Sequence, residues 1–184
     1  VTAYRAVTTS AAREARNRHV LIERVRHQGK IDLEVISGEE EARLVRVAVL
    51  RALRDSDPPR YILDLGGGSL EVNVLRQGVL QESIGLPLGT VRLMEAFRAQ
   101  GVIHEEVANA IRLHVLSVLQ SALPNRPRLF DALTVACGGN AETLAALASG
   151  PRIGGYTTLN SRLLADRLWQ ILRLNVEERM KTFS

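Results

Sequence analysis

The sequence predicts a mixed α/β fold with a meander of β-hairpins in its middle. Apolar residues recur with the helical period in some segments and alternate with the period of two typical of strands in others. The stretch "YILDLGGGSLEVNVL", residues 61–75, places a glycine-rich turn between two runs of strand character. The chain has 184 residues, of which 46% are hydrophobic and 24% are charged. It can therefore bury the core of one ordinary domain or of two small ones.

The first part of the chain predicts helix, strand and helix in turn. Residues 10–28 predict a helix with Thr9 or Ser10 as its cap and a loose apolar stripe. Residues 32–36 predict a short strand. The segment "SGEEEARLVRVAVLRALR", residues 37–54, predicts a helix of about four to five turns.

The cluster "DSDPPR" at residues 55–60 is the best internal boundary of the chain. Its prolines and turn-forming residues interrupt both helices and strands. The boundary divides the chain into a first domain, residues 1–57, and a second domain, residues 58–184.

The second part predicts three successive strands and then a series of helices. The strands are expected at residues 60–65, 70–75 and 79–84, with a turn at Gln77 and Gly78. The segment "ALTVACGGNAETLAALAS" predicts a buried strand, a Gly-Gly turn and a helix. The other helices are expected at residues 87–99, 105–123 and 161–174, with a proline-bracketed loop at 124–127 and a last helix capped by Asn175.

Composition excludes several classes of function. Aromatic residues make up only 4% of the chain, so a base-stacking surface, and with it DNA or RNA as a partner, is not expected. The net charge is +4, and almost all of the positive charge comes from arginine, since lysine occurs only at positions 30 and 181. Guanidinium groups suit phosphate binding, but these arginines are spread along the chain and favour solvated helix faces.

Cysteine content and hydropathy predict a cytoplasmic protein. Cys137 is the single cysteine, so the chain forms no internal disulfide, as is usual in a reducing compartment. No apolar run reaches the length of a membrane span and no signal-peptide pattern opens the chain.

The glycine turn predicts an anion-binding nest. Alternation of period two resumes after Ser69, so the turn closes a hairpin; a P-loop or dinucleotide motif would open a helix there. Without Cβ atoms, Gly66, Gly67 and Gly68 can turn successive N–H groups toward one point, and the Ser69 hydroxyl can add a donor. A tight turn without a ligand is the alternative, although a hairpin needs fewer glycines than three.

Two carboxylates beside this turn predict a Mg²⁺ site. Asp64 ends an apolar run, where a carboxylate is costly unless it faces a cleft or a cation. Magnesium prefers one or two carboxylates together with phosphate oxygens. Glu71 lies on the strand face opposite Leu70 and Val72 and could hold the same ion, or it could be an outward, solvated residue.

Three consecutive glutamates differ in their expected roles. Glu40 stands three residues after Ser37, the spacing of a capping box. Glu39 heads an outward polar strip formed by Ala42, Arg43 and Arg46. Glu41 heads an inward stripe formed by Leu44, Val45 and Ala48. Partial desolvation there would make Glu41 a better general base, whereas the alternative is a surface glutamate that favours the helix dipole.

Five separated segments carry the most specific signal, through their order and spacing. They are "TTSAAREARN" at 8–17, "VISGEEEARL" at 35–44, "DLGGGSLEV" at 64–72, "SIGLPLGTVRL" at 83–93 and "ACGGNAETLAAL" at 136–147. Together they resemble the exopolyphosphatase/guanosine pentaphosphate phosphohydrolase (Ppx/GppA) family, which belongs to the superfamily of actin, sugar kinases and Hsp70. The resemblance covers nearly the whole chain and implies an actin-like (ribonuclease H-like) two-domain ATPase fold, incomplete at both ends.

The resemblance also assigns site residues. It implies that Asp64 to Ser69 form the second phosphate loop, that Asp64 and Glu71 surround the metal, and that Glu41 activates the attacking water. Arg13 of the "TSA-x-R" segment would contact phosphate. The later loop, whose N–H groups would hold a further phosphate or a nucleotide, corresponds to Gly138, Gly139 and Asn140.

The implied activity is hydrolysis of a terminal phosphoanhydride with Mg²⁺. The substrate would be inorganic polyphosphate, guanosine pentaphosphate (pppGpp) of the stringent response, or both, and the complete protein would be a homodimer. One alternative is a non-catalytic phosphate- or nucleotide-binding module. A second alternative is an actin-like sugar kinase, for which the sequence shows no dedicated carbohydrate motif.

The chain also departs from the family pattern. It lacks the "D-x-G-S-N-S" strand that carries the first phosphate loop, and it begins with valine inside the first domain. We therefore expect an internal fragment that is inactive on its own.

Overall fold

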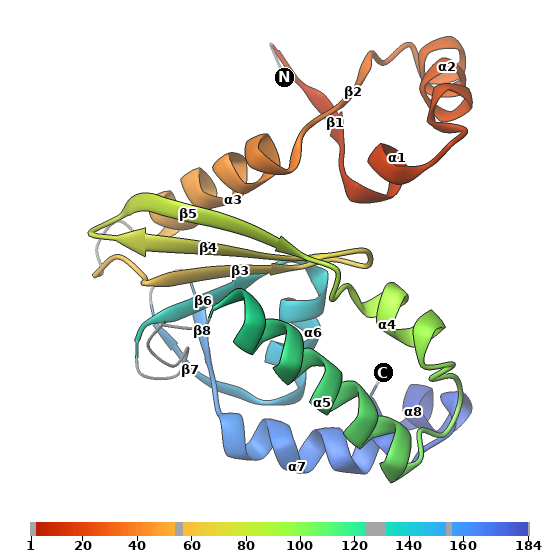
Figure 1. Cartoon of the computed structure of the whole chain (residues 1–184), viewed down its shortest axis with the longest axis vertical. Coiled ribbons are helices and arrows are strands. Elements are labelled where there is room, and N and C mark those ends of the chain that lie inside the picture. The colour runs from red at the N-terminus through yellow and green to blue at the C-terminus, as the bar shows by residue number, and fades with distance from the viewer. Residues whose placement is uncertain (1–2, 54–56, 124–131, 154–155, 184) are drawn as a thin grey trace.

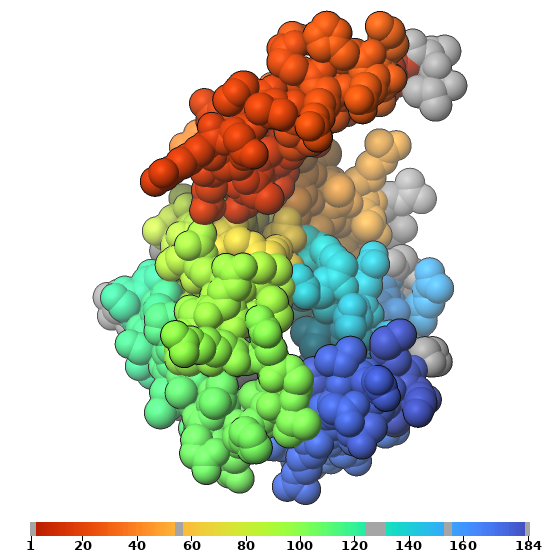
Figure 2. Space-filling model, turned by 90° about the vertical axis from the view of Figure 1, so that its right-hand side faces the viewer, coloured from red at the N-terminus to blue at the C-terminus, as the bar shows by residue number. Residues whose placement is uncertain are grey.

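The computed structural model describes residues 3–53, 57–123, 132–153 and 156–183. In these residues the chain forms a small N-terminal unit joined by a long helix to a larger, sheet-centred body (Figure 1). Figure 2 shows the N-terminal unit as a lobe above that body. The mixed α/β prediction is confirmed. The predicted loop at 124–127 lies outside the described residues, as do residues 55–56 of the predicted boundary at 55–60.

The N-terminal unit consists of two short parallel strands and two helices. Its elements are β1 (Ala6–Thr8), α1 (Ser10–Glu14), α2 (Arg18–Gly29) and β2 (Leu33–Val35). The prediction of one helix over residues 10–28 is wrong. Ala15 has a ψ of 127°, an extended conformation that interrupts the helical hydrogen bonds between α1 and α2. No residue of α2 is buried, so the apolar stripe expected there has no core to pack against.

Helix α3 (Gly38–Ala52) leads from this unit to the sheet and begins as the capping box predicted. The Ser37 Oγ accepts a hydrogen bond from the Glu40 N–H at 3.2 Å. This cap places the first turn of α3, with its glutamates, beside the N-terminal unit (Figure 1).

The buried face of α3 differs from the predicted one. Ala42, expected on the outward strip, is only 2% exposed, whereas Ala48, expected on the inward stripe, is exposed. The helix turns a different face to the sheet than the one predicted, because Val49 and Leu53, the residue that follows α3, pack against the sheet. Packing against the sheet therefore set the rotation, which the local pattern misjudged.

The body is built on a four-stranded sheet in the order β5-β4-β3-β6. Its strands are β3 (Tyr61–Leu65), β4 (Leu70–Arg76), β5 (Val79–Leu86) and β6 (Thr134–Cys137). β4 runs antiparallel to both β3 and β5, as the predicted meander requires, and β6 runs parallel to β3.

The two faces of the sheet bury different cores. One face packs against α5 (Glu105–Ala122) through the buried side chains of Tyr61, Val72, Val74, Leu86 and Leu88. The other face packs Ile62 and Leu75 against α3. On this second face, Ile62 near the start of β3 is covered by α3. Asp64, near the end of β3, and its partner Glu71 lie on the same face beyond the apolar core.

The remaining elements complete the body. They are α4 (Thr90–Ala96), α6 (Gly139–Leu147), β7 (Ser149–Ile153), β8 (Tyr156–Leu159), α7 (Ser161–Leu172) and α8 (Val176–Phe183). The β7–β8 hairpin was not predicted. The Asn175 cap is confirmed, since its Oδ1 accepts from the Glu178 N–H at 3.0 Å. Among the described residues, no helix combines the length and apolarity needed to cross a membrane.

Candidate functional site

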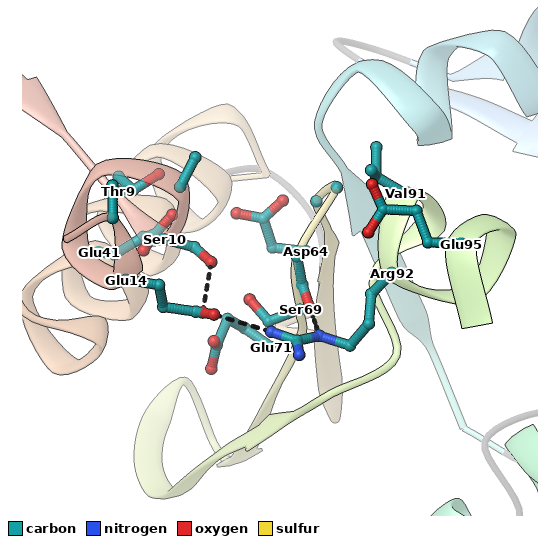
Figure 3. A pocket seen from close by; sticks show the side chains of 15 residues that line it. Thr9, Ser10, Glu14, Glu41, Asp64, Ser69, Glu71, Val91, Arg92 and Glu95 are labelled. Carbon is teal, nitrogen blue, oxygen red and sulfur yellow. Dashed lines mark hydrogen bonds and ion pairs between the residues drawn. The ribbon is translucent and has the colours of Figure 1, made fainter. Parts of the chain in front are cut away.

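A cleft of about 570 Å³ lies between the N-terminal unit and the body (Figure 3). The glycine loop, residues 66–69, forms its floor, with α1 on one side and α4 on the other. Its lining residues are Thr9, Ser10, Ala11, Glu14, Ala15, Glu41, Asp64, Gly66, Gly67, Gly68, Ser69, Glu71, Val91, Arg92 and Glu95. The cleft thus brings together the predicted general base, both predicted metal ligands and the whole predicted phosphate loop.

The sheet presents Asp64 and Glu71 to this cleft as a pair. The two residues are direct partners in the antiparallel register of β3 and β4, so their side chains share one face. Gly85 is the partner of Glu71 on the other side, and a Cβ at that position would lie 3.0 Å from the Glu71 Oε2. The missing side chain at residue 85 therefore leaves space for the carboxylate.

Asp64 and Glu71 have no ion-pair partner among the described residues, although the positive charge of Arg13 acts on Glu71. Burial raises the pKa of Asp64, and the nearby Glu41 carboxylate raises it further. Burial also raises the pKa of Glu71, although a hydrogen bond from Ser69 offsets part of this effect. Such a pair favours a positive ligand.

This electrostatic cost predicts a pH-dependent effect on stability. A carboxyl whose pKa is higher in the folded than in the unfolded chain favours folding while protonated, and it loses that contribution as the pH rises through the folded pKa. Asp64→Asn should therefore raise the unfolding midpoint at pH 7 by about 2 °C and change it little near about pH 3. Thermal unfolding at both pH values measures this difference.

Asp166→Asn is the matched control for that measurement, because Asp166 is exposed on α7. An equal or lower midpoint for Asp64→Asn than for the wild type at pH 7 would contradict the assignment of Asp64 as a desolvated carboxylate.

The glycine loop is positioned from behind by the start of α4. The Gly66 carbonyl accepts from the Thr90 N–H at 3.0 Å, and the Gly67 carbonyl accepts from the Val91 N–H at 2.9 Å. Gly89 permits this contact, because a Cβ there would lie 2.2 Å from the Gly67 oxygen. In a trans peptide the N–H points opposite to the C=O. The Gly66 and Gly67 carbonyls point toward α4, so the N–H groups of Gly67 and Gly68 point away from it. α1 and α3 lie in that direction across the cleft (Figure 3).

Glu41 faces the loop from the opposite wall. It lies in the first turn of α3, and its side chain is 18% exposed. Arg13 contacts it, with 3.3 Å between the Arg13 Nη1 and the Glu41 Oε2, and the same Nη1 donates to the Ile36 carbonyl at 3.0 Å. Arg13, predicted to contact phosphate, therefore lies behind Glu41 and does not itself line the cleft.

The second glycine loop lies behind Asp64 and outside the cleft lining. Gly138 has a φ of +89°, and a Cβ there would lie 2.9 Å from the Asp64 Oδ1. The Asn140 Nδ2 donates to the Leu65 carbonyl at 2.6 Å, so this side chain ties α6 to the end of β3. Gly139 has open space around its Cα. The loop at residues 138–140 thus lies against Asp64 and Leu65, directly beside the glycine loop at residues 66–69, and its phosphate binding stays a prediction.

Among the polar residues of the cleft that sequence reasoning missed, Ser10, Glu14 and Arg92 form one connected group. Arg92 contacts both Glu14 and the glycine loop, and Ser10 donates to Glu14 at 3.1 Å. All three belong to quoted motifs of the chain, "TTSAAREARN" and "SIGLPLGTVRL". Glu14 and Arg92 are separated by 78 residues, so no local pattern signals their contact.

Asp64 and Glu71 are too few ligands for a metal ion by themselves, but they fit magnesium when phosphate oxygens supply further ligands. Within the described ranges, no group of three or more His, Cys, Asp or Glu side chains is arranged to hold a metal ion. Magnesium, however, is commonly held by one or two carboxylates together with phosphate oxygens and water. The unpaired Asp64 and Glu71 meet that requirement.

The fold of this chain is the actin-like ATPase fold of solved Ppx/GppA proteins. A Ppx/GppA phosphatase of Aquifex aeolicus aligns with a TM-score of 0.70 at 28% identity, over 97% of this chain and 59% of that one. An exopolyphosphatase of Cytophaga hutchinsonii has the same fold, with a TM-score of 0.78 at 24% identity, over 98% of this chain and 60% of that one.

The chain belongs to the Ppx/GppA phosphatase family, whose model matches residues 1–181. It is 31% identical to exopolyphosphatase 1 of Mycobacterium tuberculosis in an alignment 172 positions long that covers 84% of this chain and 47% of the relative. It is 35% identical to exopolyphosphatase 2 of the same organism in an alignment 150 positions long that covers 78% of this chain and 46% of the relative. The chain therefore spans about half the length of these relatives. The predicted family and fold are confirmed.

Proposed function

We propose that the cleft hydrolyses a terminal phosphoanhydride, with inorganic polyphosphate as the substrate. The observation that carries this proposal is that Glu41 lines the same cleft as a glycine loop whose carbonyls are bonded to α4, which directs its N–H groups away from α4. Relatives named exopolyphosphatase support polyphosphate as the substrate class. Guanosine pentaphosphate carries the same terminal phosphoanhydride and is the second substrate to test.

Each group in the cleft has a distinct role in this proposal. The N–H groups of the loop stabilise negative charge on the phosphate oxygens, and the Ser69 hydroxyl, which bonds to Glu71 in the structure, turns to the phosphate when it binds. Glu41 orients a water molecule in line with the terminal phosphorus and accepts its proton. Arg13 holds the Glu41 carboxylate in place through the contact at 3.3 Å.

Asp64 and Glu71 would hold Mg²⁺ beside the phosphate chain in this proposal. When bound there, the ion would neutralise charge on the phosphate oxygens. Without a cation, the two carboxylates would repel the substrate, which is why their unpaired state supports a metal-dependent site.

A phosphate-release assay on the complete protein with polyphosphate and with guanosine pentaphosphate, each with and without MgCl₂, tests the proposed function. Tripolyphosphate binding is measured in parallel by calorimetry and should weaken as salt is added. Magnesium-dependent release supports the hydrolase. Binding without release indicates the alternative, a phosphate-binding module, and transfer of phosphate from ATP to a sugar indicates the kinase. Absence of both binding and release would overturn the proposal.

A further inference from the structure

Arg92 connects the two walls of the cleft through two separate contacts. Its Nε donates to the Gly68 carbonyl at 2.8 Å, and its Nη2 pairs with the Glu14 Oε2 at 2.9 Å (Figure 3). Glu14 belongs to the N-terminal unit, and Gly68 belongs to the body. The guanidinium therefore bridges the unit that carries α1 and the loop that faces it.

With the contact between Arg92 and Gly68, all three glycine carbonyls of the loop are hydrogen-bonded to α4. The Gly66 and Gly67 carbonyls accept from the backbone of α4, and the Gly68 carbonyl accepts from the Arg92 side chain. The Gly68 C=O and the Ser69 N–H belong to one trans peptide and point in opposite directions. Arg92 thereby controls the direction of the Ser69 N–H, the last donor of the nest.

Glu14 and Ser10 determine where the Arg92 guanidinium lies. Ser10 donates to one oxygen of the Glu14 carboxylate, and Arg92 pairs with the other. Ser10 also packs on the loop itself, since a Cβ at Gly68 would lie 2.7 Å from the Ser10 Oγ. The carboxylate is thus fixed at one oxygen and presents the second to Arg92.

We propose that Arg92 is a positioning residue of the anion nest: it orients the Ser69 N–H toward phosphate and is itself oriented by Glu14. This inference rests on the proposed function of the cleft. Its contribution to stability should be small, because the Arg92 and Glu14 side chains are 43% and 58% exposed and such ion pairs contribute little. Its effect should be on anion binding, because the donor direction matters when an anion is bound.

The first experiment measures tripolyphosphate binding to Arg92→Met by calorimetry, at fixed ionic strength and with MgCl₂. We expect affinity about tenfold weaker than wild type, the loss of one hydrogen bond to a charged group, with an unchanged unfolding midpoint. Arg112→Met removes the same charge from an exposed site on α5 and is the matched control. Arg92→Lys should recover part of the affinity, since its single ammonium cannot reproduce the guanidinium fork.

A second experiment separates positioning from direct contact between Arg92 and phosphate. If Arg92 bound phosphate directly, Glu14 would compete for it, and Glu14→Gln would tighten binding. Positioning predicts that Glu14→Gln weakens binding and adds nothing to Arg92→Met in the double variant. Glu95→Gln removes a carboxylate from the same cleft without touching the bridge, and controls for the change in charge.

A third measurement needs no ligand. In Arg92→Met the carbonyl ¹³C resonance of Gly68 should shift as its hydrogen bond is lost, whereas the resonances of Gly66 and Gly67 stay in place. Wild-type chain that binds no tripolyphosphate overturns the proposed function itself. Wild-type binding that Arg92→Met leaves unchanged, or that Glu14→Gln tightens more than Glu95→Gln does, overturns only the role of Arg92.

Discussion

In the complete protein, replacing Glu41 with glutamine is expected to reduce phosphate release from polyphosphate by a factor of about 100 or more, the usual contribution of a general base. Glutamine keeps the size of the side chain and its place in the first turn of α3, but it cannot accept a proton from water. Tripolyphosphate binding should remain within about twofold, because the loop that holds the phosphates is unchanged. Phosphate release and calorimetric binding, measured on the same preparation, test both expectations.

Glu39→Gln is the matched control for this prediction. Glu39 lies two residues earlier on the same helix, is exposed and does not line the cleft. The Glu39→Gln substitution removes the same charge from the same helix N-terminus as Glu41→Gln does, so any general effect on the helix dipole appears in both variants. Release by Glu41→Gln equal to that of Glu39→Gln would remove Glu41 from the mechanism.

Gly89→Ala is expected to have the largest effect on the phosphate loop. A Cβ at this position would lie 2.2 Å from the Gly67 carbonyl oxygen and equally close to the Gly68 carbonyl carbon, so backbone must move to admit it. We expect α4 to separate from the loop and the loop N–H groups to lose their direction. Tripolyphosphate binding should fall below detection, and the free energy of unfolding should decrease by about 2 to 3 kcal/mol.

Gly29→Ala tests whether that loss is specific. The same added methyl group at Gly29 meets only the Ile31 side chain, at an ordinary contact distance of 3.7 Å. Chemical denaturation and calorimetry compare the two variants. A Gly89→Ala protein that binds tripolyphosphate as tightly as Gly29→Ala does would show that the α4 contact does not organise the nest.

Several features of the site were predictable because they depend on residues close in the chain. The glycines and Ser69 are contiguous, and Asp64 and Glu71 flank them on strands that a tight turn forces to pair. Their proximity follows from the hairpin alone. The Ser37 cap is equally local, since Ser37 and Glu40 lie within one turn.

Glu41 was selected by an argument that was only partly correct. The predicted inward stripe behind it is not the buried face, because Ala48 is exposed and Ala42 is buried. Glu41 nevertheless lines the cleft, because it lies in the first turn of α3, where the helix leaves the N-terminal unit. Position along the helix, and not the hydrophobic stripe, places this carboxylate at the site.

By itself, the sequence determined the family, the order of elements around the central hairpins and the identity of the loop with its two carboxylates, because these are set by contiguous residues and their local geometry. Only the tertiary structure decided the buried face of α3, the location of the loop at residues 138–140 behind Asp64, and the bridge from Glu14 through Arg92 to Gly68. These features depend on contacts between segments far apart in the chain. Such contacts form only when whole elements pack against one another, so no spacing within the sequence indicates them.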